Sequence, residues 1–231
     1  MKRISSLFLF ALLLAAASCS AGESYANDIE DAQKPYDDVE ISVLPNRADV
    51  VVTIKRDDAG VVFFQYGSDR LFPGEGYPFD GQCRAIGAVT IYAEEVLNYG
   101  HRVSVNWLEP IDRGDFLLYP TQAMGADGLD VLTDSWITSV EDGYLTIHYK
   151  TWWGEPSAHH DFVLVQENDP YELTLLHDAH GDGRDDYSDG TVYFDINTLP
   201  PTDGSPRKLK INWTSTDGKP VSAEFEFETR I

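Results

Sequence analysis

Alternation of apolar and polar residues from residue 40 onward is the feature that most limits how this chain can fold. Apolar residues recur at every second position in short runs, and clusters of Gly, Pro, Asp and Asn separate the runs. Val50, Val52 and Ile54 would share one face of a strand. Val103, Val105 and Trp107 would share one face of another. No stretch has a convincing helical period, so the sequence predicts an all-β protein.

The expected strands form two groups, on either side of a tract rich in Gly and Asp at residues 120–130. The first group predicts a small closed or partly closed barrel, because closure removes exposed sheet edges. The second predicts a two-sheet, immunoglobulin-like sandwich. We therefore expect a barrel domain at residues 40–120 and a sandwich domain at residues 130–231. The expected strands are 40–44, 49–56, 61–66, 84–94, 101–108, 115–119, 135–140, 144–152, 159–166, 171–177, 191–196, 207–214 and 221–229, with a loop at 72–78.

The last two expected strands permit a prediction of register. Apolar residues occupy odd positions on both strands, so odd residues must lie opposite odd residues. A two-residue turn would break this parity. The three-residue loop Thr216-Asp217-Gly218 preserves it, with its glycine in the left-handed conformation. Lys210 then lies across from Glu224, and Lys208 lies across from Glu226.

The N-terminus has the features of an export signal. Lys2 and Arg3 precede an apolar run of about a dozen residues, which is shorter than the roughly 20 residues of a membrane-spanning helix. Small residues then lead into Cys19, as in the lipobox of bacterial lipoproteins. We expect residues 1–18 to be removed and Cys19 to carry lipid. The alternative is an ordinary secretory signal in which Cys19 has no role.

The mature chain would be strongly acidic. The signal holds two of the 17 basic residues and none of the 39 acidic ones, which leaves a formal charge of −24. Nucleic-acid binding requires Lys and Arg to neutralise phosphates, and no basic stripe is present, so we exclude nucleic-acid partners. Residues 19–39 show no sustained periodicity and predict a flexible tether. Their early acidic residues suit either a surface-export signal or a solvated linker.

Five short tracts give the chain a resemblance to a known family. They are Asp80-Gly81-Gln82, Asp134-Ser135-Trp136-Ile137, Gly143-Tyr144-Leu145-Thr146-Ile147, His159-His160-Asp161-Phe162-Val163-Leu164-Val165 and Leu175-Leu176-His177-Asp178-Ala179-His180-Gly181-Asp182. Their order and spacing resemble the NigD-like lipoproteins of anaerobic Gram-negative bacteria, over most of residues 40–231. The resemblance implies an N-terminal OB-like barrel followed by a C-terminal β-sandwich, and no established reaction. Cys83 departs from the pattern, because arginine is more usual directly after Gly-Gln.

The second expected domain holds the best candidates for a site. Five of the six histidines lie there: His148, His159, His160, His177 and His180. Adjacent residues of a strand point to opposite faces, so His159 and His160 would not easily share a metal, and no ligand spacing typical of zinc is present. Ordered polar packing is the alternative. The loop from Asp178 to Asp189 is rich in carboxylates and suits either calcium or simple solvation, without the spacing of an EF-hand.

The remaining reactive or aromatic residues allow structural explanations. Cys83 begins an apolar run, where a free thiol usually packs as a small hydrophobic group. Trp152, Trp153 and Trp213 could stack on sugars or fill a core. We find no catalytic residue, no metal ligand set and no cofactor motif. We expect a non-enzymatic protein of the bacterial envelope, anchored to the outer membrane through lipid on Cys19, facing the periplasm or the cell surface.

The role of such a protein stays open between three interpretations. The first is a binding or accessory module for an unidentified protein or glycan partner. The second is a glycan-binding or glycan-active protein, with or without calcium. The third is a structural component of the envelope. A groove lined by an exposed tryptophan and two converging carboxylates would favour the second.

Overall fold

The computed structural model describes residues 46–74, 82–96, 100–119, 125, 127–155 and 157–229. All regular elements within these ranges are strands, which confirms the all-β class. None of the described residues belongs to a helix long and apolar enough to cross a membrane. The expected signal at residues 1–18, Cys19, the tether at 19–39 and the strand at 40–44 lie outside the described residues.

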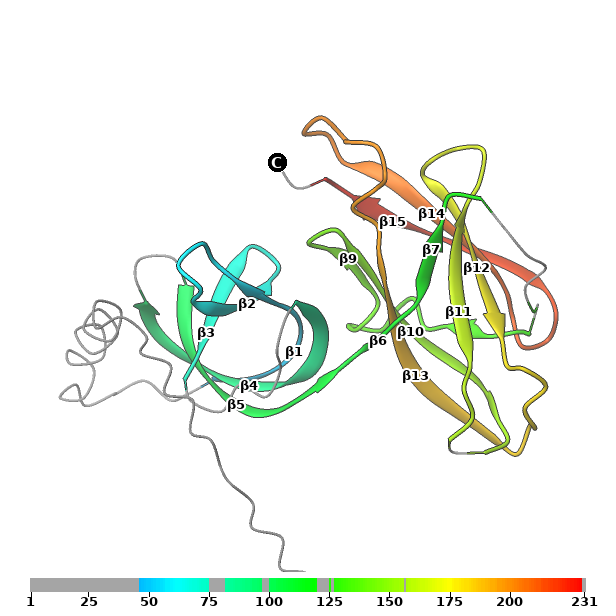
Figure 1. Ribbon diagram of the computed structural model, residues 1–231, viewed down its shortest axis with the longest axis horizontal. Coiled ribbons are helices and arrows are strands. Elements are labelled where there is room, and N and C mark those ends of the chain that lie inside the picture. The colour runs from blue at the N-terminus through cyan, green and yellow to red at the C-terminus, as the bar shows by residue number, and fades with distance from the viewer. Residues whose placement is uncertain are drawn as a thin grey trace, which may run out of the picture. The chain divides into compact units, whose positions relative to one another are not determined.

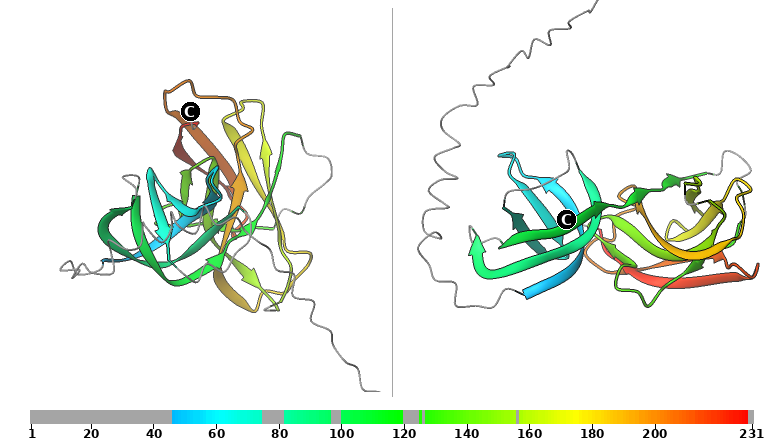
Figure 2. Two further views of the ribbon diagram at one scale, coloured as in Figure 1. Left: turned by 60° about the vertical axis from the view of Figure 1, so that its left-hand side comes forward. Right: turned by 90° about the horizontal axis from the view of Figure 1, so that it is seen from below.

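Five strands close into a barrel (Figure 1) with the order β1-β2-β3-β5-β4. Figure 2 shows these strands, coloured blue to green, from two further sides. Val50, Val52 and Ile54 have no exposed surface and pack in the barrel interior, as predicted. The arrangement confirms the expected small OB-like barrel. The strands are β1 (Asn46–Arg56), β2 (Val62–Tyr66), β3 (Asp69–Pro73), β4 (Cys83–Val96) and β5 (Gly100–Pro110).

The face predicted for the fifth strand is wrong at Trp107. Val103 is buried and Val105 packs against the barrel interior, but Trp107 is 41% exposed. The pairing shifts at this point, because Val89 lies opposite Val105 whereas Ala88 lies opposite Trp107. One extra residue on β5 forms a β-bulge, which reverses the alternation of side chains along the rest of the strand.

Part of the tract expected to be a loop at residues 72–78 is a strand. Phe72 and Pro73 end β3, which pairs in parallel with β5 and antiparallel with β2. Pro73 is the last residue of its strand, where the missing N–H interrupts the ladder least. Residues 75–78 lie outside the described residues.

The second module is a sandwich of two sheets around one apolar core. The first sheet has the order β6-β13-β10-β8, with β9 also paired to β10, and the second has the order β15-β14-β12-β11-β7. This confirms the expected β-sandwich. The strands are β6 (Asp112–Arg113), β7 (Asp115–Leu117), β8 (Asp130–Val131), β9 (Ser139–Glu141), β10 (Tyr144–Trp153), β11 (Asp161–Gln166), β12 (Glu172–Asp178), β13 (Asp186–Asp195), β14 (Arg207–Thr214) and β15 (Pro220–Phe227).

Two expected strands differ in the structure. The strand expected at 115–119 is β7, and it pairs in parallel with β11 of the sandwich rather than with the barrel. The strand expected at 135–140 is mostly turns, and only β9 at its end joins a sheet. The Ser135 and Thr138 hydroxyls form hydrogen bonds with backbone groups in and around this segment. Such bonds compete with the hydrogen bonds of a sheet.

The final hairpin has the predicted register. Lys210 lies opposite Glu224 and Lys208 lies opposite Glu226. The Ser215 N–H donates to the Lys219 carbonyl at 2.9 Å, which encloses a three-residue loop at 216–218. Gly218 has a φ of 78°, the left-handed conformation that the loop requires. The ion pairs differ from the register, because Lys208 reaches diagonally to Glu224 and Lys210 bonds to Glu172 of β12. The Lys210–Glu172 contact therefore also connects the hairpin to the neighbouring strand.

Candidate functional site

A fully buried arginine joins the barrel to the sandwich. The Arg84 guanidinium, on β4, donates hydrogen bonds to the hydroxyls of Thr53 and Thr146, both at 3.0 Å. It also forms an ion pair with Glu141 at 2.8 Å. Thr53 belongs to the barrel, whereas Thr146 and Glu141 belong to the sandwich. A buried charge is tolerated only with such partners, so Arg84 holds Glu141 in place.

An apolar cluster surrounds this contact. Val51 of the barrel packs with Ile137, Tyr144 and Tyr193 of the sandwich and with Ile111, which lies in the link between the two modules. Lys55 of β1 adds an ion pair to the nearly buried Asp142 at 2.6 Å. Residues Pro45–Ile231 accordingly form one compact unit. The barrel and the sandwich therefore share packed and ion-paired side chains at this contact.

An open groove of about 540 Å³ adjoins this contact, and Val51 and Glu141 belong to both. The volume lies in the range of small-ligand sites, roughly 300–1,000 Å³. Trp136 is 56% exposed and Tyr66 is 38% exposed. Aromatic rings and carboxylates thus gather on one concave surface, which we call the junction groove. Its lining residues are Asp49, Val51, Tyr66, Gly67, Ser68, Asp69, Trp136, Ser139 and Glu141.

The exposure of Trp136 is imposed by its loop. The next residue, Ile137, is buried in the shared apolar cluster. The loop is closed by bonds from the Ser135 N–H to the Leu132 carbonyl and from the Thr138 N–H to the Ser135 carbonyl, both at 3.1 Å. The Thr138 hydroxyl also donates to the Leu132 carbonyl. Trp136 is therefore presented to solvent by a segment that packing and hydrogen bonds hold in place.

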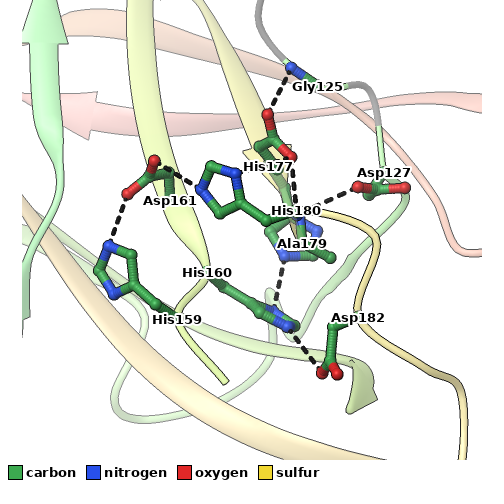
Figure 3. A network of polar contacts seen from close by, with 10 residues as sticks. Gly125, Asp127, His159, His160, Asp161, His177, Ala179, His180 and Asp182 are labelled. Atoms are coloured by element: carbon green, nitrogen blue, oxygen red, sulfur yellow. Dashed lines mark hydrogen bonds and ion pairs between the residues drawn. The ribbon is translucent and has the colours of Figure 1, made fainter. Parts of the chain in front are cut away.

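Four of the five predicted histidines gather at one end of β11 and β12 (Figure 3). His160 and His177 are buried, and the His177 Nε2 and His160 Nδ1 atoms lie 3.0 Å apart. His159 and His180 are exposed, and both contact Asp161 at 2.8 Å. His159 and His160 thus point to opposite sides, as predicted. No group of three or more His, Cys, Asp or Glu side chains in the described part of the chain is placed to hold a metal ion.

The buried pair is a polar core element. The Asp182 carboxylate accepts the Gly154 N–H at 2.7 Å and lies 3.3 Å from His160 Nε2. The hydrogen bond from the Gly154 N–H is the main reason why the pKa of Asp182 is lowered. The Asp182 carboxylate therefore stays ionised and acts only as a hydrogen-bond acceptor. His160 Nε2 therefore donates to Asp182, and a second hydrogen bond joins His160 Nδ1 to His177 Nε2. Burial, with the neighbouring His160, lowers the pKa of His177 to about 4, which keeps this imidazole neutral.

Several carboxylates in and around the acidic loop accept hydrogen bonds from backbone N–H groups. Asp178 accepts the N–H groups of Gly125 and His180, and these bonds lower its pKa, the His180 bond most. Asp127 accepts the Ala179 N–H at 2.9 Å. Together with Asp182, these groups close the loop as hydrogen-bond acceptors. Ordered packing, rather than a calcium site, accounts for the contacts that the described residues make.

His148 lies apart from the other histidines, between a serine and an aspartate. Its Nδ1 lies 2.7 Å from the Ser135 hydroxyl and its Nε2 lies 3.0 Å from the Asp189 carboxylate. Catalytic triads use the two ring nitrogens in the opposite sense. The Ser135 hydroxyl also accepts the Ile137 N–H at 3.2 Å, and the bond to His148 lowers the pKa of Asp189. The arrangement fixes the loop that carries Trp136.

The other predicted residues have structural surroundings. Cys83 is half-buried, and burial raises the pKa of its thiol, which makes it a poor nucleophile. Trp153 stacks on His160 at 4.0 Å between ring centres, and Trp152 packs on Tyr187 at 5.1 Å. Trp213 is buried in the sandwich core. Cys19 lies outside the described residues.

The junction groove is the feature that sequence reasoning missed. Trp136 stood in one of the tracts that carry the family resemblance, and it fell in the strand expected at 135–140, where the structure has turns. An aromatic residue among turn-forming neighbours was the available signal. Arg84 gave none, because its partners Thr53 and Thr146 are 31 and 62 residues away in the sequence.

A protein-family model matches the C-terminal part of the chain. Residues 119–227 match the NigD-like C-terminal beta sandwich domain. This range contains β8 to β15 of the sandwich, whereas β6 and β7 precede it. No curated protein matches the sequence.

Several solved structures share the fold. A protein from Parabacteroides distasonis described as toxin-related is 25% identical, with a TM-score of 0.68. The match covers 80% of this chain and 94% of that protein. A NigD-like immunity protein from Bacteroides caccae is 15% identical with a TM-score of 0.58, covering 81% and 100%. A protein from Bacteroides fragilis described as a lipoprotein is 15% identical with a TM-score of 0.59, also covering 81% and 100%. The last two likenesses show the fold alone.

Proposed function

We propose that the chain is a NigD-like, lipid-anchored, non-enzymatic binding module of the bacterial envelope; the match of residues 119–227 to the NigD-like C-terminal beta sandwich domain supports the family. The observation that carries the binding role is the junction groove, where the exposed Trp136 ring faces solvent beside three carboxylates. Exposed aromatic surface that the fold holds in a concave site is typical of ligand recognition. A purely structural envelope component would not require this arrangement.

Lipid on Cys19 is the proposed anchor, after removal of residues 1–18 and with residues 19–39 as the tether. Support comes from the charged start, the apolar run and the small residues before Cys19. Labelling of cells with a palmitate analogue tests it. The wild type and a Cys83→Ser variant should carry label, and a Cys19→Ser variant should not. An unlabelled wild type, or label that persists in Cys19→Ser, contradicts the anchor.

The outer membrane, on its periplasmic or surface face, is the proposed location. A similar fold in a protein described as a lipoprotein supports an envelope role. Protease added to intact cells distinguishes the faces, because only a surface-exposed chain is cut. Recovery of the native protein mainly from the culture fluid would contradict anchoring at either face.

The absence of catalysis is part of the proposal. Burial raises the pKa of the Cys83 thiol, and the Ser135 hydroxyl is held by both His148 and the Ile137 N–H. A fluorophosphonate probe labels serine nucleophiles that a base activates. We expect no adduct on Ser135 under conditions that label a serine hydrolase control. An adduct on Ser135 that is lost in His148→Gln would overturn this part of the proposal.

Glycan binding is a second candidate function. Trp136 beside Asp49, Asp69 and Glu141 is the kind of groove that this alternative calls for. A photo-reactive phenylalanine analogue in place of Trp136 tests for any occupant of the groove in living cells, with the same analogue at the exposed Trp107 as the control. We expect a crosslinked product at position 136 that is missing at 107. Equal products at both positions, or none, would contradict binding in the groove.

A further inference from the structure

The ionisable side chains of the junction groove are all acidic. None of its nine lining residues is a lysine or an arginine. Glu141 is already paired with Arg84 at 2.8 Å. Asp49 and Asp69 are exposed, and no side-chain ion pair or hydrogen bond reaches their carboxylates within the described ranges. The groove therefore presents two carboxylates whose charge the described fold leaves unpaired.

Two cations on these elements have partners outside the groove. Lys55 on β1 pairs with Asp142 at 2.6 Å. Arg70, next to Asp69, lies over the Phe63 ring at 4.7 Å from its centre. Arg47 is exposed on the same face of β1 as Asp49 but does not line the groove. The negative charge of the groove is thus available to a ligand.

The aromatic wall adds a second kind of recognition. Trp136 is 56% exposed, and its loop is held by hydrogen bonds and by the buried Ile137. The face of a tryptophan ring attracts ammonium and guanidinium groups within about 6 Å, more strongly than tyrosine or phenylalanine does. A fixed ring beside unpaired carboxylates therefore suits a ligand that is both cationic and partly apolar. The side chains of lysine and arginine have this character.

We propose that the junction groove binds a lysine- or arginine-bearing segment of a partner protein. The cationic head lies beside Asp49 and Asp69, and the stem or the guanidinium plane lies against Trp136. This names the ligand of the site in the proposed function and rests on it. Charge distinguishes such a partner from a neutral glycan, because only a cation gains Coulomb attraction from both carboxylates, whereas a sugar gains hydrogen bonds alone. A cation offsets the two carboxylate charges and is also attracted at long range by a chain of formal charge −22.

Binding of defined probes to the mature chain in detergent micelles tests the proposal. The probes are hexalysine and the neutral hexasaccharide cellohexaose, measured by calorimetry at low salt. We expect hexalysine to bind and cellohexaose not to bind. Trp136→Ala and the double variant Asp49→Asn/Asp69→Asn should each weaken hexalysine binding by about 10-fold. Added salt should weaken binding to the wild type, because it screens exposed charges.

Two control variants separate the groove from the general charge of the protein. Trp107→Ala removes another exposed tryptophan, and Glu226→Gln/Glu228→Gln removes two exposed acids of the last strand and its end. Both should change the hexalysine affinity less than about 2-fold. Equal losses in the controls, or no hexalysine binding, would overturn the proposal. If cellohexaose binds and Trp136→Ala abolishes this binding, the cationic ligand is overturned. The proposed binding function of the groove would stand in that case. No crosslink at position 136 in cells would instead remove that function.

Discussion

Two acidic regions of this protein use their carboxylates in opposite ways. At the end of β12 and in the loop that follows it, Asp178 and Asp182 accept backbone N–H groups, and those bonds lower their pKa values. In the junction groove, Asp49 and Asp69 are exposed and make no such contact in the described structure. Asp178 and Asp182 are therefore committed to the fold, whereas Asp49 and Asp69 keep carboxylates that the described structure leaves unpaired. Local density of acids is thus a poor guide to a site.

The largest expected effect concerns the third acid of the groove, Glu141. Replacing Arg84 by methionine removes the charge that holds it and leaves Thr53 and Thr146 without their donor. We expect a loss of about 3 kcal/mol in the free energy of unfolding, measured by urea denaturation. The exposed Arg47→Met is the control and should change stability by less than about 0.5 kcal/mol. Similar stability of both variants would show that Glu141 is as unconstrained as Asp49 and Asp69.

The histidine pair beside the acidic loop should give the next largest effect. Because the folded-state pKa of His177 lies at about 4, below its usual 6.5, the unfolded chain binds this proton first as pH falls. The free energy of unfolding should therefore drop by about 2 to 3 kcal/mol between pH 7 and pH 4.5. The lowered pKa values of Asp178 and Asp182 act mainly below about pH 4, so the two contributions separate.

Urea titrations at several pH values check this dependence, with His159→Gln as the matched control because His159 is exposed. The control should keep the slope of the wild type. In His177→Phe the slope between pH 7 and pH 4.5 should be largely lost, although this variant starts from a lower stability. A His177→Phe variant with the full slope would assign the effect to another group.

A smaller effect is expected within the acidic loop itself. Asp182→Ala leaves the Gly154 N–H and His160 Nε2 without their acceptor. We expect a loss of about 2 kcal/mol in the free energy of unfolding. Asp185→Ala, in the same loop and exposed, should cost less than about 0.5 kcal/mol. If the two variants lose equal stability, the loop is a solvated acidic hairpin rather than a set of backbone acceptors.

The smallest effect on stability should come from the groove. Asp49→Asn/Asp69→Asn changes two exposed carboxylates that have no partner to lose. The free energy of unfolding should change by less than about 0.5 kcal/mol, while hexalysine binding weakens. A loss above about 1 kcal/mol would place these acids with Asp178 and Asp182 as structural groups.

Local patterns in the sequence predict more of the fold than of the site. The parity of apolar residues is enough to set the register and loop of the final hairpin, because both depend on neighbouring positions. The face of Trp107 was lost because a bulge leaves no mark in the alternation. Trp136 and Arg84 depend on contacts between distant segments, Ile137 with Val51 and Arg84 with Thr146, and no local period contains that information.

The most direct test of the contrast between the two acidic regions is an NMR titration of the mature chain with hexalysine. The account predicts shifts in the Trp136 indole signal and in the backbone amides of Asp49 and Asp69, with the amides of residues 178–189 unchanged. Shifts centred on residues 178–189, with the Trp136 signal unmoved, would contradict it.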